Sequence, residues 1–170
     1  MSLLISYRAQ TISYRAIVPA LSATVNLLKP FTVGESVSVG VIIRNNSSTV
    51  ARQFKPELRW AFAATGHPPL IDYSKELVKE VVGGMTFDGA VSDLNGGTET
   101  LLLSTDGLHL DVNLFNAVTN REHYLYVFGR ASFKDIDDRP HELHFCRLYD
   151  PQPGINNSEL KYCQSYNETK

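Results

Sequence analysis

The chain has 170 residues and a formal net charge of −2, and its hydrophobic and charged fractions, 43% and 20%, are those of an ordinary globular protein. This length predicts a single domain that can bury a core without metals. No block of basic residues suggests a nucleic-acid partner, and no apolar run approaches the roughly 20 residues of a membrane span. We therefore expect this chain to be soluble.

Residues 1–20 are interpreted as an N-terminal stalk or linker remnant. The sequence Ile-Ser-Tyr-Arg-Ala occurs at 5–9 and again at 12–16. A repeat after seven positions places equivalent residues on one side of a helix. Two copies do not establish a coiled coil, and chance repetition is the simpler explanation.

The domain proper is expected over residues 21–150, and its first part alternates apolar and polar residues as strands do. Trp60, the single tryptophan, is interpreted as a core anchor between two sheets. The residues expected to face inward are Ala23, Val25, Leu27, Val37, Val39, Val41, Ile43, Leu58, Trp60, Phe62 and Ala64, with Glu57 and Arg59 facing outward.

The middle of the chain is less regular. Residues 73–82 fit a short helix or an edge strand, and the helix is preferred because their apolar residues share one side. Residues 98–104 predict a strand with Leu101 and Leu103 facing inward. The apolar spacing over 108–118 predicts a short helix or helical turn.

Residues 124–149 predict a hairpin of two long strands at the centre of the domain. Its first strand is apolar on both faces, which is typical of a strand covered on both sides. Gly129 suggests a bulge or a close approach of another backbone. Residues 134–140 carry turn-forming residues and a proline, and form the connection. The two faces of the first strand are Leu125, Val127, Ala131 and Phe133 on one side and Tyr124, Tyr126 and Phe128 on the other.

About six or seven strands without regular β-α alternation predict an all-β fold, an antiparallel immunoglobulin-like β-sandwich with one or two short helices. The core disulfide of antibody domains cannot form, because the second strand has no cysteine. Residues 151–170 are expected to be an irregular C-terminal tail that packs on the domain.

Cys146 and Cys163 are the two cysteines of the chain, and they leave two interpretations open. Both are thiols, or they form one disulfide that closes a C-terminal loop in an oxidising compartment. Neither lies in a C-x-x-C motif, which argues against zinc binding and thioredoxin-like chemistry.

Metal-ligand residue types gather only at His123, His141, His144 and Cys146. Strand spacing places His144 and Cys146 on one face, but a metal site needs three or four converging ligands. We interpret these histidines as surface and rim residues, and predict neither a metal nor a cofactor.

The turn after the first hairpin strand carries Asp135, Asp137 and Asp138, followed by Arg139. It lacks the glycine and glutamate of a calcium-binding EF-hand loop. We interpret it as a candidate interaction loop, together with the loops over residues 66–70 and 85–97. The chain contains no G-x-S-x-G, H-E-x-x-H or P-loop motif, so an enzyme is not expected and no catalytic residue is assigned.

The hairpin carries a family resemblance, in Tyr-Val-Phe-Gly-Arg-Ala-Ser-Phe-Lys-Asp at 126–135 and Phe-Cys-Arg at 145–147. Cys163 followed by Tyr-Asn-Glu at 166–168, and Val-Ile-Ile-Arg-Asn at 41–45 followed by Ala51, extend it. These residues resemble the β-sandwich domain of uncharacterised bacterial membrane-anchored proteins, over roughly residues 21–167. At the loop after Asn45, Asn46 and Ser47 replace the usual glycine, and no proline precedes Ala51.

The resemblance implies a sandwich whose membrane anchor is absent from this chain, and it supplies no activity. The expected function is a non-enzymatic interaction or ligand-sensing module beside a bacterial membrane, with an unknown protein or small ligand as partner. The alternative is a purely structural or self-associating domain, and the third option is a small hydrolase or metal-dependent enzyme. The side of the membrane stays open.

Overall fold

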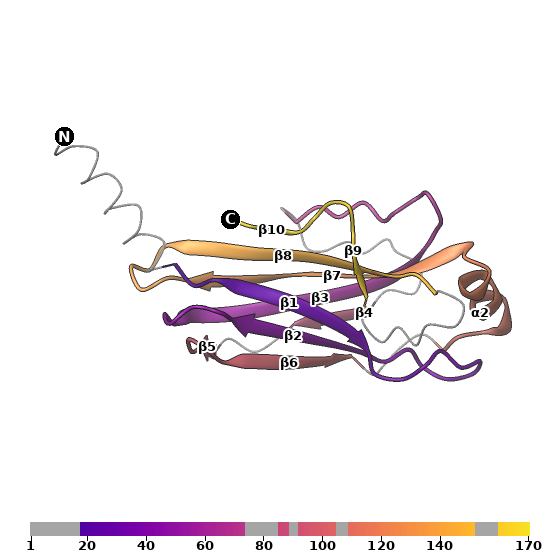
Figure 1. Ribbon diagram of the computed structural model, residues 1–170, viewed down its shortest axis with the longest axis horizontal. Coiled ribbons are helices and arrows are strands. Elements are labelled where there is room, and N and C mark those ends of the chain that lie inside the picture. The colour runs from indigo at the N-terminus through magenta and orange to yellow at the C-terminus, as the bar shows by residue number, and fades with distance from the viewer. Residues whose placement is uncertain (1–17, 74–84, 89–91, 105–108, 152–159) are drawn as a thin grey trace.

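In a computed structural model of the chain, the described strands pair antiparallel and a short helix lies at one end of the sandwich (Figure 1). The expected all-β sandwich is confirmed, while its immunoglobulin-like topology stays a prediction. The structure describes residues 18–73, 85–88, 92–104, 109–151 and 160–170, with only the backbone given for residues 85–88 and 104.

The smaller sheet has three strands in the order β1-β2-β6, namely β1 (Leu21–Leu27), β2 (Val39–Asn45) and β6 (Glu99–Ser104). The apolar residues of β1 and β2 point into the core as expected, and Val25, Val39 and Val41 are fully buried. Alternation in the sequence predicted these two strands correctly because one face of each is covered and the other is not.

The expectation for β6 was wrong by one residue. Leu101 and Leu103 were predicted to face inward, but they are 55% and 49% exposed, whereas Leu102 is 6% exposed. Three consecutive leucines carry no alternation, so the sequence does not show which face is inward. Pairing with β2 decides it, because Leu102 lies opposite the core residue Val41.

The larger sheet has the order β10-β8-β7-β3-β4, and two short strands pair at its margins, β5 with β3 and β9 with β8. The predicted central hairpin is confirmed as β7 and β8, which pair from Leu125 opposite Tyr149 to Lys134 opposite Pro140. The strands are β3 (Ala51–Ala64), β4 (Met85–Asp88), β5 (Ser92–Leu94), β7 (His123–Lys134), β8 (Pro140–Tyr149), β9 (Lys161–Tyr162) and β10 (Glu168–Thr169).

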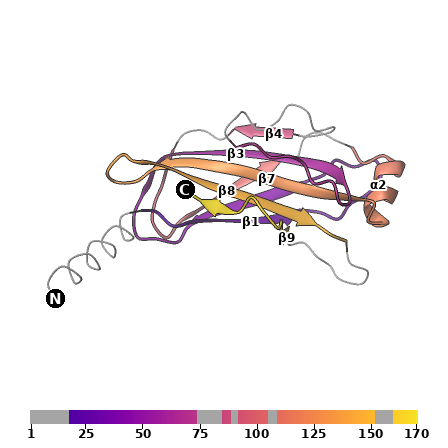
Figure 2. The same cartoon turned by 90° about the horizontal axis from the view of Figure 1, so that it is seen from above.

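The C-terminal tail differs from expectation because it is not irregular throughout. β9 and β10 both pair with β8, and Figure 2 shows them beside that strand. Strands of two residues are too short to produce a pattern that the sequence can reveal. The tail therefore extends the larger sheet at the β8 edge.

β3 corrects one expectation and refines another. Ala64, predicted inward, is exposed at the end of the strand. Glu57 lies on the outer face as predicted, but the residue is covered there and only 8% exposed. Glu57 is buried because Arg130 of β7 lies directly opposite and pairs with it. A carboxylate is tolerated at such a position when a guanidinium satisfies both of its oxygens.

The core between the sheets is centred on aromatic residues. Trp60 is 1% exposed and meets Phe62 edge-on, with 6.0 Å between the ring centroids, so it is the predicted core anchor. A Cβ atom at Gly129 would lie 2.3 Å from the carbonyl oxygen of Glu57 and 2.6 Å from Cζ of Phe145. Glycine is required there because β3 and the Phe145 ring approach the strand closely.

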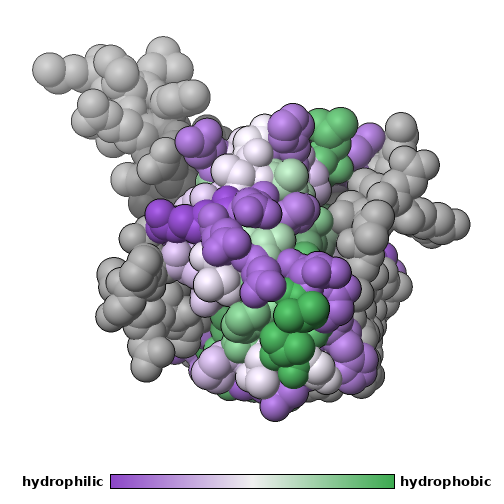
Figure 3. All heavy atoms as spheres, turned by 90° about the vertical axis from the view of Figure 1, so that its right-hand side faces the viewer, coloured by the Kyte–Doolittle hydropathy of each residue, from purple (hydrophilic) through white to green (hydrophobic). Residues whose placement is uncertain are grey.

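The helix α2 (Val112–Thr119) lies at one end of the sandwich, at the predicted position. Asp111 caps it, because its carboxylate accepts a hydrogen bond of 2.8 Å from the backbone N–H of Leu114. Figure 3 views this end, where the larger apolar area lies low in the view among mostly hydrophilic side chains and a smaller one lies near the top.

Two expected elements lie outside the described residues, namely the N-terminal stalk before residue 18 and the helix expected after Tyr73. Among the helices that the structure describes, none is both long enough and apolar enough to cross a membrane.

Candidate functional site

A second buried cluster lies on the outer face of the larger sheet, opposite the core. Tyr126 and Phe128 of β7 and Cys146 of β8 form it, and Ile71, from the segment after β3, is buried against them. β7 is therefore covered on both faces, as its two apolar faces predict. The covering segments are the chain from Thr65 to Tyr73 and the C-terminal residues.

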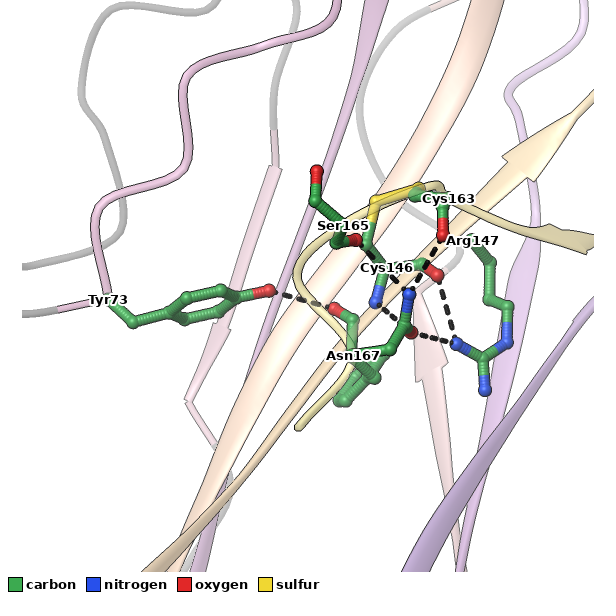
Figure 4. The surroundings of a disulfide bond; sticks show 7 residues. Tyr73, Cys146, Arg147, Cys163, Ser165 and Asn167 are labelled. Atoms are coloured by element: carbon green, nitrogen blue, oxygen red, sulfur yellow. Dashed lines mark hydrogen bonds between the residues drawn. A yellow bond between two sulfur atoms is a disulfide. The ribbon is translucent and has the colours of Figure 1, made fainter. Parts of the chain in front are cut away.

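The C-terminal segment is fastened to β8 by a disulfide between Cys146 and Cys163, with 5.4 Å between their Cα atoms. Of the two interpretations left open by the sequence, the structure contains the disulfide. Asn167 adds a second fastening, shown in Figure 4: its Oδ1 accepts from the backbone N–H of Cys146, and its Nδ2 donates to the carbonyls of Cys163 and Ser165. We call residues 162–167 the strap.

Arg147 connects the strap to both sheets. Its side chain donates to Oδ1 of Asn167 and to the carbonyl of Ala23 in β1, and its guanidinium lies 3.7 Å from the ring centroid of Tyr162. The residue is only 5% exposed, although it carries a charge. A guanidinium tolerates burial where its donors are used and an aromatic face covers it.

Tyr73 docks the other covering segment onto β8. Its ring stacks on His144, and its hydroxyl donates a hydrogen bond of 2.9 Å to the carbonyl of Phe145. Burial, with smaller contributions from Tyr166 and Glu168, raises the pKa of Tyr73 above its usual range. The phenol is thus neutral, and acts as a hydrogen-bond donor.

A row of charged and polar side chains crosses the outer face beneath Tyr73. The strand registers place Glu57 opposite Arg130, Arg130 opposite His144, and His144 opposite Glu168. Glu57 and Arg130 form a two-pronged ion pair with both distances at 2.9 Å, and the backbone carbonyl of Tyr73 accepts from Arg130. This row fixes the positions of four strands relative to one another.

Between the strap and the chain from Gly66 to Ile71 lies a groove of about 350 Å³. Its floor is the second buried cluster, and its walls are two proline residues on one side and the tyrosines of the strap on the other. It is lined by Gly66, Pro68, Pro69, Ile71, Tyr126, Cys146, Leu148, Tyr162, Cys163, Gln164, Ser165 and Tyr166.

Among the described residues that line this groove, none has an acidic or basic side chain. Its polar groups are phenols, the Gln164 amide and the Ser165 hydroxyl. Burial raises the pKa of Tyr126, so this phenol is also neutral at ordinary pH. Such a surface can bind an uncharged ligand through aromatic contacts and a few hydrogen bonds. No carboxylate or imidazole is found among its described lining residues.

The sequence suggested that every charged residue of the Asp-rich turn could contact a partner, but the structure separates Asp135 from the others. Asp135 is fully buried and accepts hydrogen bonds from the backbone N–H groups of Asp137 and Arg139 and from Nε2 of His141. It therefore organises the turn and cannot present its carboxylate to a partner. Asp137, Asp138 and Arg139 are exposed, and Asp138 pairs with Arg52 at 3.1 Å and has a φ of 61°.

The residues considered as metal ligands do not converge. His141 contacts Asp135, and the two ring nitrogens of His144 lie 2.7 Å from Glu142 and 3.3 Å from Glu168. Cys146 is committed to the disulfide. Within the described ranges, no three His, Cys, Asp or Glu residues are grouped so that they could hold a metal ion.

Of the three loops expected to carry contacts, residues 66–70 lie at the groove, and the Asp-rich turn contributes no residue to it. The loop over 85–97 is described only in part. Sequence reasoning missed Tyr126, Leu148 and the strap tyrosines as site residues. The signal that could have revealed them is the second apolar face of the hairpin, with Tyr126 and Phe128. An apolar face must be covered by another segment, and Cys146 on the same face indicates where that segment could be attached.

Comparisons with known proteins give no family for this chain. No family model matches it, and no curated protein matches it. The structure of Spo0M, a sporulation control protein from Bacillus subtilis, aligns with 14% identity and a TM-score of 0.39 over 80% of this chain and 51% of that one. This chain thus spans about half of that protein. The structural genomics target SoR45 aligns with 11% identity and a TM-score of 0.40 over 87% and 96% of the two chains.

Proposed function

We propose that this chain is a non-enzymatic interaction or ligand-sensing module of a membrane-anchored bacterial protein, and that it binds an uncharged ligand or protein segment in the groove beside the disulfide. The membrane anchor rests on the family resemblance alone. The observation that carries the binding site is the groove itself, on the outer face of the larger sheet. Its described lining consists of tyrosines, prolines, a disulfide and other residues without acidic or basic side chains.

Three features support a binding site over a site of catalysis. The walls are held by the disulfide, by Asn167 and by Tyr73, so the groove is formed before a ligand arrives. Tyrosine and proline supply rigid contact area at a small entropic cost. Among the described residues, the acidic and basic side chains of the row beneath Tyr73 pair with one another and do not line the groove.

The test uses two uncharged probes, a capped octaproline peptide and a neutral oligosaccharide, titrated into isotopically labelled protein and followed by amide chemical shifts. Tyrosine- and proline-lined grooves bind extended proline-rich peptides, and aromatic rings also stack on sugars. We expect one probe to shift resonances of the strap and of residues 66–71, and we expect Leu148→Arg to abolish these shifts.

The matched control is Ile136→Arg, which places the same charge at an apolar residue that is 50% exposed in the Asp-rich turn. This variant should bind as the wild type does. If neither probe perturbs the groove, or if Leu148→Arg leaves the perturbation unchanged, the groove is not the binding site.

A second candidate function is a structural or self-associating domain. It is favoured by one observation: Leu101 and Leu103 of β6 are about half exposed on the outer face of the smaller sheet, where a monomer usually carries polar residues.

A further inference from the structure

The two edge strands of the three-stranded sheet, β1 and β6, differ in whether other parts of the chain hydrogen-bond to them. Along β1, the carbonyl of Ala23 accepts from Arg147 and the carbonyl of Val25 accepts from the backbone N–H of Leu160. The chain itself therefore closes this edge. At the other edge, β6 pairs with β2 and with no further strand among the described residues.

The outer face of the same sheet changes from polar to apolar between these edges. On β1 the outward residues are Ser22, Thr24 and Asn26. On β6 they are Leu101 and Leu103, which the strand register places beside Ile42 and Gly40 of β2. We call Leu28, Ile42, Leu101 and Leu103 the outer leucine patch.

Gly40 makes this patch flat. A Cβ atom there would lie 2.8 Å from Cδ2 of Leu28 and 3.7 Å from Cδ1 of Leu101, so these two side chains close over the glycine. Leu28 is 47% exposed. A flat apolar face beside an edge strand that has no lysine or proline is a surface on which another strand can pair, and monomeric proteins normally guard such edges.

We propose that β6 pairs with β6 of a second copy of this chain, antiparallel, with Leu102 of one copy opposite Leu102 of the other. In this register Leu101 of each copy lies opposite Leu103 of the other. Antiparallel pairs keep each residue on its own face, so the outer leucine patches of the two copies form one continuous apolar surface. The inward Leu102 side chains likewise join the two cores.

The charges around β6 select a second copy in this orientation. Glu99 begins the strand and pairs with Arg44 at 2.6 Å, and Lys29 pairs with Glu35 at 2.9 Å near Leu28. Each of these two described pairs is neutral overall, so the pairs do not make two copies repel each other. In the antiparallel register the two Glu99 residues lie about 20 Å apart along the strands, beyond the screening length of about 8 Å. Parallel pairing in register would place them side by side.

This inference rests on the second candidate function and not on the groove. Dimerisation can therefore be absent while a probe binds in the groove, and dimerisation can occur while no probe binds. Sedimentation equilibrium of the full chain over a wide range of concentration is the first measurement. We expect the wild type to reach twice its chain mass of 19.0 kDa, and the variant Leu101→Lys/Leu103→Lys to remain at the single mass at every concentration.

The matched control is Ser22→Lys/Thr24→Lys, which places the same two charges on the outer face of β1. It should dimerise as the wild type does. A wild type that stays monomeric, or a Leu101→Lys/Leu103→Lys variant that still dimerises, would overturn the proposal.

The register is tested by cross-linking single-cysteine additions with oxidised glutathione, whose reduction accompanies the formation of the new disulfide. Leu101→Cys mixed with Leu103→Cys should give a covalent heterodimer, because these positions lie opposite one another, and neither variant alone should cross-link efficiently. Efficient cross-linking of each variant with itself would contradict the register. Vesicles of phosphatidylcholine test a lipid surface as the alternative partner. If the wild type is monomeric and binds these vesicles while Leu101→Lys/Leu103→Lys does not, the patch contacts lipid and the proposal is overturned.

Discussion

The ring of Tyr73 lies flat on the imidazole of His144, with 4.1 Å between the ring centroids and 10° between the planes. This contact joins the segment after β3 to the edge of the hairpin, more than seventy positions further along the chain. The same tyrosine donates from its hydroxyl to Phe145 and accepts at its backbone carbonyl from Arg130. One residue thus fixes the segment that forms a wall of the groove.

Tyr73 is expected to contribute to stability through two separable interactions. Tyr73→Phe removes the hydroxyl bond and should lower the free energy of unfolding by about 1 kcal/mol. Tyr73→Ala also removes the stacked ring and should cost about 3 kcal/mol. Chemical denaturation measures both losses, and equal losses in the two variants would show that the stacking contributes nothing.

The raised pKa of Tyr73 also predicts a pH dependence. A group whose pKa is higher in the folded state stabilises the fold fully below its unfolded value, about 10 for a phenol, and this stability is lost as the pH rises above that value. The free energy of unfolding should therefore fall less steeply above pH 10 in Tyr73→Phe than in the wild type. Identical slopes would contradict the assignment.

The ion pair between Glu57 and Arg130 is expected to be strongly coupled, because its two side chains are only 11% and 20% exposed. Removing one partner leaves a poorly hydrated charge, so Glu57→Ala or Arg130→Ala should destabilise the domain by about 3 kcal/mol. The double variant should lose less than the sum of the two single losses by at least about 1 kcal/mol.

A matched cycle on Arg44 and Glu99 provides the control, since these side chains pair at the surface with exposures of 59% and 48%. Their coupling is expected to stay below about 0.5 kcal/mol. Equal coupling in the two cycles would show that burial of Glu57 does not strengthen its ion pair.

Asp135 should make the fold sensitive to acid. Burial alone would raise its pKa, but the hydrogen bonds from His141 and from the backbone N–H groups of Arg139 and Asp137 outweigh burial and hold the pKa below its usual range. Asp135 therefore makes its full contribution to the free energy of unfolding above about pH 4, the ordinary pKa of an aspartate. This contribution is lost as the pH falls further.

Asp135→Ala is expected to lower the free energy of unfolding at neutral pH by about 3 kcal/mol, since it leaves two backbone donors of the turn unpaired. Its stability should also depend less on pH below 4, which thermal melts at several pH values will show. Asp137→Ala, in the exposed part of the same turn, should change stability by less than about 0.5 kcal/mol.

Gly129→Ala is expected to be among the most damaging small substitutions in the chain. The added methyl would lie 2.3 Å from the backbone oxygen of Glu57, which cannot move without disturbing the pairing of β3 with β7. Gly40→Ala is the matched control on another strand, because its nearest neighbour is the exposed end of Leu28 at 2.8 Å, which can rotate away. Melting temperatures should fall by several degrees more for the first variant than for the second.

Much of the architecture could be predicted because burial leaves a periodic signal. The coverage of each strand face explains three sequence features. They are the alternation in β1 and β2, the apolar residues on both faces of β7, and the position of Gly129. The face of β6 could not be predicted, since Leu101, Leu102 and Leu103 are chemically identical and only the partner strand distinguishes them.

The candidate site was less predictable for a related reason. Its walls come from residues 66–71 and from the strap, which are distant in sequence and meet only through the disulfide, Asn167 and Tyr73. The aspartates of the turn looked alike in the sequence, yet Asp135 faces inward and its neighbours face outward. Short-range pattern carries no information on such long-range contacts.

The disulfide between Cys146 and Cys163 joins residues that are 17 positions apart, so every peptide bond from Arg147 to Tyr162 lies inside a covalent ring. A single cut anywhere in that ring leaves the chain in one piece, because its two fragments stay linked through sulfur. A protease that nicks the protein there yields an intact band on a non-reducing gel and two bands after reduction. The strap would thus remain tethered beside the groove even in a nicked molecule.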